Sequence, residues 1–235
     1  MSVGLRRPIL GHLHIPDIGE AGWRKALLAC GIAFPVLWVG MDIVASLLYD
    51  GYSYADQTVS ELSAVGAPTR TFWMAFGSVD GILAVAFAMG VWQSAGRRRA
   101  LRFVAALIAA QAIFNLALGP FSSMHQREVL AADGASLSDT LHLVIVAVGG
   151  IIFLIETSFA APAFGRGFRL YSVATVLVVL VMGFITSSYA SEVQDNEPTP
   201  LVGIYERISA YGYELWIAML AIALLRRAAQ DDAHP

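Results

Sequence analysis

"LYSVATVLVVLVMGFITSSY", residues 170–189, is a continuous apolar stretch without a charged side chain. A helix that crosses a bilayer needs about 20 mainly apolar residues, because each residue adds about 1.5 Å across about 30 Å of hydrocarbon. Five further stretches are also mainly apolar, although each contains at least one charged residue. They cover residues 26–48, 72–94, 101–121, 140–161 and 204–225. Since backbone polar groups in lipid must be paired within the segment, we expect an all-α, polytopic membrane protein with six transmembrane helices arranged as three hairpins.

The composition of the whole chain agrees with this class. Hydrophobic residues make up 57% of the 235 residues and charged residues only 14%, with a mean hydropathy of +0.64. A water-soluble globule of this size needs more polar side chains on its surface. The net charge of -3 is small and the basic residues are scattered in short clusters, so nucleic acid is not an expected partner. The lone Cys30 excludes an internal disulfide.

The basic residues predict the orientation of the chain. They precede the first stretch, join the second to the third and the fourth to the fifth, and follow the sixth. These residues are Arg6, Arg7, Arg24, Lys25, Arg97, Arg98, Arg99, Arg102, Arg166, Arg169, Arg226 and Arg227. Because Lys and Arg accumulate in cytoplasmic loops, both termini are expected in the cytoplasm. The loops at 49–71, 122–139 and 190–203 then face the extracytoplasmic side of a prokaryotic inner membrane.

The same pattern predicts one membrane domain with two short tails. We expect a cytoplasmic N-terminal tail over residues 1–25 and a six-helix transmembrane domain over residues 26–227. A cytoplasmic C-terminal tail follows over residues 228–235.

The first outer loop contains a polar stretch, "DQTVSELSAVGAPTR", at residues 56–70. Thr58 and Glu61 have the three-residue spacing of a capping box, which predicts a short helix at this point. Alternatively, Ser60, Glu61 and Arg70 point into a pocket over the bundle. Ser60 and Glu61 are then candidate catalytic residues, and Arg70 is a candidate ligand-binding residue.

The second outer loop has the most reactive side chains. His125 and Arg127 follow the third apolar stretch, while Asp139 and His142 are three residues apart and share a helix face. His125, Asp139 and His142 are candidate ligands for a divalent metal such as zinc, with an open position for water. Such a metal lowers the pKa of its bound water and permits hydrolysis near neutral pH. Alternatively, Asp139 caps the following helix and the histidines bind nearby carbonyl groups.

The sixth apolar stretch carries a polar stripe. Arg207, Tyr211 and Glu214 follow the i, i+4, i+7 spacing of one helix face, and Glu206 begins a neighbouring stripe. All four are candidate ligand-binding residues. A carboxyl group at the depth of Glu214 is costly in lipid, so it is expected to face protein or water.

Several other polar residues fall inside the apolar stretches, and no Lys or Arg falls at a comparable depth in the sequence. They are Asp42, Asp80, Gln111, Asn115 and Glu156. Such groups can form hydrogen bonds between helices. The alternatives are a proton or cation path, or the polar floor of a pocket.

Three motifs together resemble a known family. They are "QTVSELSAVGAPTR" before the second stretch, "MHQR" and "SDTLH" around the third and fourth, and "YERISAYGYELW" in the sixth. In this order they resemble the prokaryotic membrane family named domain of unknown function 998, over residues 31–227. The resemblance implies the architecture and the location of a site, but no chemistry. The positions it marks are Ser60, Glu61, Arg70, His125, Arg127, Asp139, His142, Glu206 and Arg207.

A weaker analogy links the chain to the ceramidase-like membrane hydrolases, which hold zinc with three histidines and use an aspartate and a serine. Here Ser60, His125, Asp139 and His142 are available. The chain departs from that group in having no third histidine in the later stretches, and six expected spans where that group has seven.

Three functional hypotheses follow. The first is a lipid-directed hydrolase, with or without a metal, in which Arg70, Arg127 or Arg207 holds an anionic headgroup. The second is a non-catalytic lipid-binding or accessory subunit, in which pairs such as Glu61 with Arg207 or Glu206 with Arg127 join the hairpins. The third is a small proton-linked transporter that uses Asp80 and Glu214. The expected partners are membrane lipid and other subunits, identical or different, within the membrane.

Overall fold

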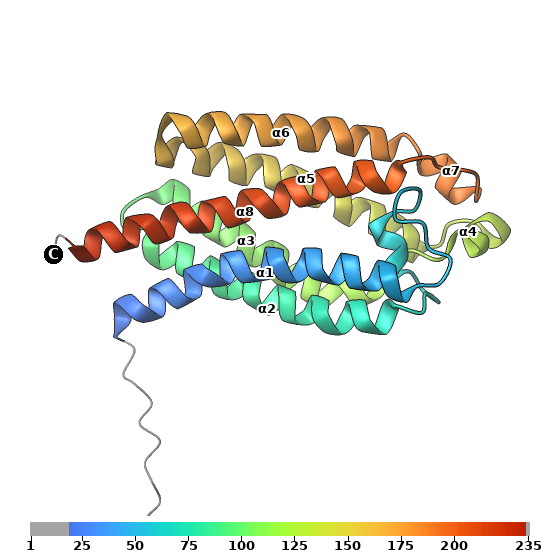
Figure 1. Cartoon of the computed structure of the whole chain (residues 1–235), viewed down its shortest axis with the longest axis horizontal. Helices are drawn as coiled ribbons and strands as arrows, with labels where there is room; N and C mark the ends of the chain where they lie inside the picture. The colour runs from blue at the N-terminus through green and yellow to red at the C-terminus, as the bar shows by residue number, and fades with distance from the viewer. Residues whose placement is uncertain (1–18, 234–235) are drawn as a thin grey trace, which may run out of the picture.

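The computed structural model describes residues 19–233, and this part of the chain is a bundle of long helices (Figure 1). The long helices are α1 (Glu20–Leu48), α2 (Arg70–Ser94), α3 (Arg99–Leu118), α5 (Leu137–Ala160), α6 (Gly165–Ser187) and α8 (Val202–Ala233). The short ones are η1 (Val59–Ser63), η2 (Gly119–Phe121), α4 (Arg127–Asp133), η3 (Ala161–Phe164) and α7 (Ala190–Gln194). Within residues 19–233 the only β-type pairing is an isolated bridge between Val65 and His125. The predicted all-α class is confirmed.

Five stretches of the described chain are long and apolar enough to cross a membrane. One of them, Leu137–Ser187, contains both α5 and α6. The chain turns back between these helices at η3, which contains Pro162 near its start and is followed by Gly165 at φ +86°. A positive φ of this kind suits glycine because it lacks a Cβ. Several apolar helices therefore identify a multi-pass membrane protein.

Two helices extend further than the apolar pattern predicts. α1 begins at Glu20 and α8 continues to Ala233, so residues 20–25 and 228–233, which we expected in the tails, are helical. Polar residues can continue a helix into water once the apolar part has fixed it, so hydropathy alone does not mark the helix end. The remaining parts of the expected tails, residues 1–18 and 234–235, lie outside the described residues.

The bundle interior is tightly packed where α1, α2 and α8 meet. A Cβ on Gly31 of α1 would lie 2.3 Å from the Phe87 ring of α2, and a Cβ on Gly90 of α2 would lie 2.8 Å from the backbone nitrogen of Leu28. Glycine therefore permits the close approach of these two helices. On the outside, large apolar side chains of α5 and α6 are exposed, such as Phe184 at 74%. Such a surface is suited to lipid.

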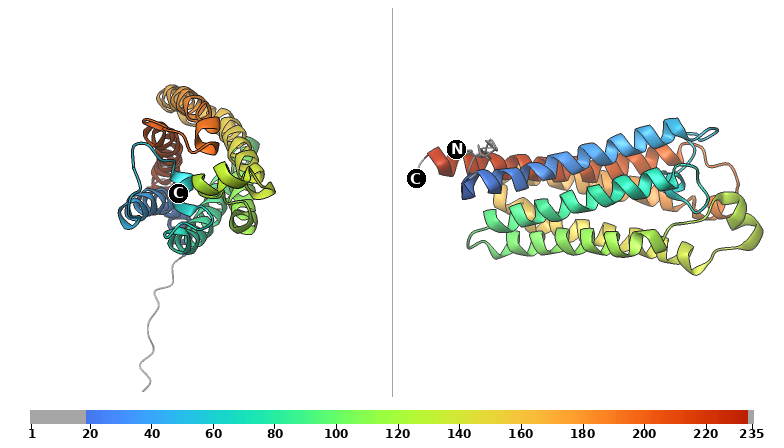
Figure 2. Two further views of the ribbon diagram at one scale, coloured as in Figure 1. Left: turned by 90° about the vertical axis from the view of Figure 1, so that its right-hand side faces the viewer. Right: turned by 90° about the horizontal axis from the view of Figure 1, so that it is seen from below.

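The long loops gather at one end of the bundle, opposite the ends of α1 and α8 that lie nearest the chain termini (Figures 1 and 2). We call this region the loop cluster; it comprises residues 49–69, 122–136 and 188–201. Backbone hydrogen bonds join the first segment to the second, from Val65 N–H to the Met124 carbonyl (2.7 Å), and to the start of α8, from Gly203 N–H to the Ala55 carbonyl (2.9 Å).

Candidate functional site

Arg127 joins all three segments of the loop cluster. It is the first residue of α4, and its side chain is buried. Its Nε and Nη2 donate to the two carboxylate oxygens of Glu61 at 2.6 and 2.9 Å. Nη1 donates to the hydroxyl of Thr199 (2.8 Å) and to the Glu197 carbonyl (3.4 Å), and Nη2 also reaches the Asp56 carbonyl (3.3 Å). The fork of N–H donors in a guanidinium suits this two-pronged pairing, and here all of its nitrogens are used.

Arg207 forms a second buried centre below the loops. Its Nε and Nη2 each donate to one oxygen of Asp42 at 2.8 Å, and both side chains are buried. Nη1 donates to the Tyr54 carbonyl (2.7 Å), and the guanidinium lies 3.7 Å from the centre of the Tyr54 ring. The Tyr211 hydroxyl donates to the same carboxylate at 2.5 Å. Asp42 therefore has a cation, although the sequence suggested that no Lys or Arg lies at its depth.

Tyr52 completes this centre from the first loop. Its hydroxyl accepts a hydrogen bond from Arg207 Nη2 (2.8 Å) and donates to the Thr58 carbonyl (2.8 Å). Burial raises the pKa of the Tyr52 hydroxyl, although Arg207 acts in the opposite direction. The hydroxyl is therefore held in its protonated form, which is the form that can donate to a carbonyl.

The ion pairs differ from those considered from the sequence. Glu61 pairs with Arg127 rather than with Arg207. Glu206 forms an ion pair with neither arginine in the described part of the chain; its Oε2 accepts the N–H of Val59, the first residue of η1, at 2.5 Å. The position of η1 therefore determines both contacts. Its residue Glu61 bonds to α4, and its N-terminal residue Val59 bonds to α8.

Ser60 and His142 form a side-chain pair between the first loop and α5. The Nε2 atom of His142 lies 3.0 Å from the Ser60 hydroxyl, and its Nδ1 lies 3.1 Å from the Ser122 carbonyl. Because a carbonyl only accepts, Nδ1 carries a proton, and Nε2 of the neutral ring accepts from Ser60. The Ser60 hydroxyl is also 3.4 Å from Glu206 Oε1. Both side chains are partly buried.

His125 and Asp139 form a separate pair at the start of α5. His125 Nδ1 lies 3.0 Å from Asp139 Oδ2, and the His125 backbone N–H donates to Oδ1 at 2.7 Å. Asp139 also accepts the backbone N–H (2.8 Å) and the hydroxyl (2.7 Å) of Ser136 and completes a capping box. The expected helix-capping role of Asp139 is thus observed, as is the capping box of Thr58 and Glu61.

These contacts do not support the expected metal centre. The carboxylate of Asp139 is occupied by four donors from its own loop, and His142 is turned toward Ser60 and Ser122. Within residues 19–233 no group of three or more His, Cys, Asp or Glu side chains is arranged to hold a metal ion. The three predicted metal ligands do not form one site, because His125 pairs with Asp139 and His142 pairs with Ser60.

Arg70 is also engaged by the protein. Its Nη1 donates to the Ser63 carbonyl (2.7 Å) and its Nη2 to the Pro120 carbonyl (3.0 Å). Arg127 and Arg207 have protein partners at every guanidinium nitrogen. An anionic headgroup bound by Arg127 or Arg207 must displace hydrogen bonds that already exist.

Unpaired polar atoms lie elsewhere, around a cavity inside the bundle. The cavity has a volume of about 400 Å³ and is partly open. It lies between α1, α2, α3 and α8, within the stretches that can cross a membrane. Its lining includes Phe34, Trp38, Met41, Trp73, Met74, Gly77, Ser78, Asp80, Gln111, Asn115, Tyr213 and Glu214. Among the described residues, Asp80 Oδ1, Gln111 Oε1 and Glu214 Oε2 are buried without a hydrogen-bond partner.

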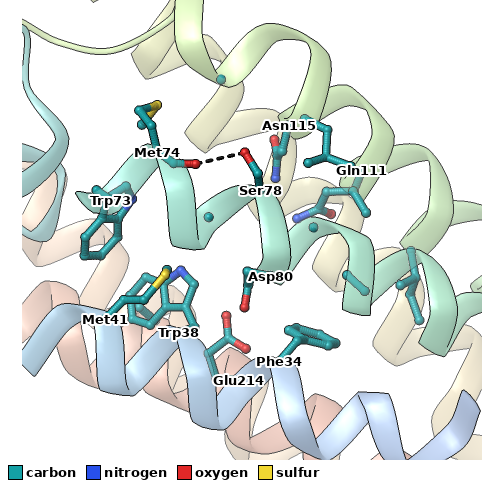
Figure 3. Close-up of a pocket in the computed structure, with 18 of the residues that line it drawn as sticks. Phe34, Trp38, Met41, Trp73, Met74, Ser78, Asp80, Gln111, Asn115 and Glu214 are labelled. Atoms are coloured by element: carbon teal, nitrogen blue, oxygen red, sulfur yellow. Dashed lines mark hydrogen bonds between the residues drawn. The ribbon is translucent and has the colours of Figure 1, made fainter. Parts of the chain in front are cut away.

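Two carboxyl groups face each other in this cavity. Figure 3 shows Asp80 of α2 and Glu214 of α8 pointing toward one another, beside the side chains of Trp38, Met41 and Phe34 from α1. Glu214 is only 6% exposed. The predicted polar stripe on α8 therefore has two parts. Arg207 and Tyr211 bind Asp42, and Glu214 lines the cavity.

Sequence reasoning missed the partner of Arg207 and the aromatic lining of the cavity. Asp42 was recognised as a polar residue inside the first span, and its charge was the signal that a cation from another helix must reach it. Trp38 and Trp73 gave no such signal, because tryptophan in a membrane helix is common at any apolar contact or interface.

Comparison with known proteins identifies a family. Residues 32–223 match the family model described as "Protein of unknown function (DUF998)", which agrees with the resemblance of the three motifs. The searches of curated proteins and of solved structures each gave no match, so the analogy with ceramidase-like hydrolases has no support from them.

Proposed function

The chain belongs to the DUF998 family, and we propose that it is a non-catalytic membrane protein that binds a small amphiphilic molecule, such as a membrane lipid, inside the bundle. The site is the cavity between α1, α2, α3 and α8, and the loop cluster holds the helices in place around it. The observation that carries the proposal is the combination of an apolar, partly open cavity with unpaired buried polar atoms at Asp80, Gln111 and Glu214.

The size and lining of the cavity support binding of a small molecule. Ligand sites are commonly clefts of about 300–1,000 Å³ with mainly apolar walls and a few polar groups. A buried polar atom without a partner costs free energy, so a ligand that supplies a partner gains affinity. The cavity is partly open and lies within segments that can cross a membrane, and the proposed ligand enters it from the bilayer.

The loop cluster supports a structural role for the charged residues at that end. Arg127 connects Glu61 of the first loop with Thr199 of the third, and Arg207 connects α8 with Asp42 of α1. Groups whose donors are all used inside the protein stabilise the arrangement of the segments they join.

The number of membrane spans and their orientation are part of the same proposal. α5 and α6 each have the length of a span, so six helices cross the bilayer as three hairpins. The positions of Lys and Arg place both termini in the cytoplasm and the loop cluster on the extracytoplasmic side of the prokaryotic inner membrane. The protein can bind further copies or other subunits within the membrane.

A lipid-directed hydrolase is the second candidate, and the pair of Ser60 and His142 favours it. In such an enzyme His142 Nε2 takes the proton of the Ser60 hydroxyl as the Ser60 oxygen adds to an ester carbonyl. The ester C–O bond then breaks, the alcohol leaves with the proton from His142, and water hydrolyses the acyl-serine. Covalent labelling of the purified protein by a fluorophosphonate probe, lost in both Ser60→Ala and His142→Ala, would favour the enzyme. Labelling that is absent, or unchanged in Ser60→Ala, would leave the binding protein as the better account.

The binding proposal is tested by a substitution that fills the cavity. Gly77 of α2 lines the cavity, and a Cβ at this position meets no atom within 4 Å. Gly77→Leu therefore fills the space without a clash at the backbone. Gly150→Leu is the matched control, because Gly150 in α5 is also surrounded by open space but does not line the cavity. We expect native mass spectrometry to detect a bound lipid on the natural protein and on Gly150→Leu, but not on Gly77→Leu. Equal lipid binding by all three proteins would contradict the proposal.

A further inference from the structure

The cavity is lined by two carboxyl groups and, among the described residues, by no basic side chain, whether Lys, Arg or His. Asp80 and Glu214 point toward one another in it (Figure 3), and each has a buried oxygen without a partner in the described part of the chain. Ionisable groups in a membrane interior normally have a partner. A cation placed between the two carboxyl groups would supply the partner that both oxygens lack within residues 19–233.

The surroundings of the two carboxyl groups favour an organic cation. Figure 3 shows Trp38, Met41 and Phe34 around the pair. The face of an aromatic ring attracts an amine or a quaternary ammonium group, and tryptophan does so most strongly. An alkylated cation also gains from apolar walls, because its carbon atoms are removed from water.

A hydrated metal ion fits this part of the cavity less well. Hard cations such as Ca²⁺ take about 6–8 oxygen ligands. In Figure 3 the amide side chains of Gln111 and Asn115, on α3, point into a different part of the cavity from the Asp80 and Glu214 pair. The labelled side chains nearest the pair in Figure 3 are the rings of Trp38 and Phe34 and the thioether of Met41, which supply no oxygen ligand.

We propose that the molecule bound in the cavity carries an organic cation, an amine or a quaternary ammonium group, which lies between Asp80 and Glu214 and against Trp38. This inference rests on the proposed binding function and assigns its ligand class. The charge selects the ligand, and the apolar walls hold its hydrocarbon part. The cation belongs either to a free small molecule or to the headgroup of a lipid such as phosphatidylethanolamine.

The test compares two ions of the same shape and opposite charge. The full-length protein in phosphatidylglycerol nanodiscs is titrated with tetraphenylphosphonium and, separately, with tetraphenylborate, and binding is followed by tryptophan fluorescence with empty nanodiscs as the blank. We expect saturable binding of tetraphenylphosphonium and none of tetraphenylborate. Equal affinity for the two ions would overturn the inference.

Two isosteric variants locate the charge. Asp80→Asn and Glu214→Gln keep the shape of the side chains, and each is expected to weaken tetraphenylphosphonium binding on the order of tenfold to a hundredfold. Glu156→Gln is the matched control: Glu156 in α5 is fully buried with both oxygens unpaired in the described chain, but it does not line the cavity. Either variant alone suffices if the other fails to fold. Unchanged affinity in a folded Asp80→Asn or Glu214→Gln protein would overturn the inference.

The outcomes separate this inference from the function on which it rests. If Gly77→Leu removes a bound lipid while the cation shows no preference over the anion, the binding function stands and the charge assignment fails. If Gly77→Leu changes nothing and neither ion binds, both fail. Adding phosphatidylethanolamine to the nanodiscs identifies the source of the cation. Weaker apparent binding of tetraphenylphosphonium then indicates a competing lipid headgroup, and unchanged binding indicates a free cation.

Discussion

Buried carboxyl groups have hydrogen-bond partners in the loop cluster but not in the cavity. In the loop cluster Glu61 is 4% exposed and its two oxygens accept from Arg127, Gln57 and Thr58. In the cavity Glu214 is 6% exposed, and its Oε2 has no partner among the described residues. Burial is nearly the same, so the difference lies in the partners. A buried carboxyl group whose partners all belong to the protein maintains the fold, whereas a carboxyl group with an unpaired oxygen is available to a ligand.

The largest effect is expected at the ion pair of Arg207 and Asp42. Arg207→Met leaves the fully buried carboxylate of Asp42 without its cation, which typically costs about 3–5 kcal/mol. The free energy of unfolding in detergent measures this loss. The double variant Asp42→Asn with Arg207→Met is expected to recover part of it, because no uncompensated charge is left. A loss below about 1 kcal/mol in Arg207→Met would show that the pair does not hold α1 to α8.

A smaller effect is expected at Thr199, which extends the network of Arg127 to the third loop. Its buried hydroxyl accepts from Arg127 (2.8 Å) and donates to the Asp56 carbonyl (2.6 Å). Thr199→Val keeps the shape and removes both hydrogen bonds, so we expect a loss of about 1–3 kcal/mol in unfolding free energy. Thr140→Val is the control, because the exposed Thr140 hydroxyl bonds only the Ser136 carbonyl of its own helix turn. Equal stability of the two variants would argue against a network that spans the loops.

The smallest effect is expected at the exposed Asp56. Hydrogen bonds from the Leu201 backbone N–H and then from the Ser53 hydroxyl lower the pKa of Asp56 below its usual value. A carboxyl group whose pKa is lowered by folding stabilises the folded state above its unfolded pKa of about 3.9, and this contribution disappears as the pH falls through the folded pKa. Asp56→Asn should therefore reduce the drop in melting temperature below about pH 4. An identical pH profile for the variant would show that these bonds contribute nothing measurable.

Local features of the helices and of the loop cluster were predictable from the sequence. The apolar stretches located the long helices, and the three-residue spacing of Thr58 with Glu61 and the capping role expected of Asp139 match capping boxes in the structure. The gathering of the three loops at one end followed from alternating hairpins. Such features depend on residues close in the sequence, where helix geometry fixes their separation.

The partners of the charged groups could not be predicted. Arg127 and Glu61 are 66 residues apart, and Arg207 and Asp42 are 165 residues apart. Which carboxylate each arginine reaches depends on the rotation of packed helices, which hydropathy does not determine. The cavity depends on the same rotations, since only they bring the faces of α2 and α8 that carry Asp80 and Glu214 together.

The most direct test makes the same chemical change in both regions. Glu61→Gln and Glu214→Gln each remove one carboxylate at nearly equal burial, and the unfolding free energy of each purified variant is compared with that of the natural protein. We expect Glu61→Gln to lose on the order of 2–4 kcal/mol, because Arg127 is left buried without its anion. Glu214→Gln should be neutral or slightly stabilised. A loss of similar size in Glu214→Gln would show that this carboxyl group maintains the fold, and would contradict the division of the molecule into a structural end and a binding cavity.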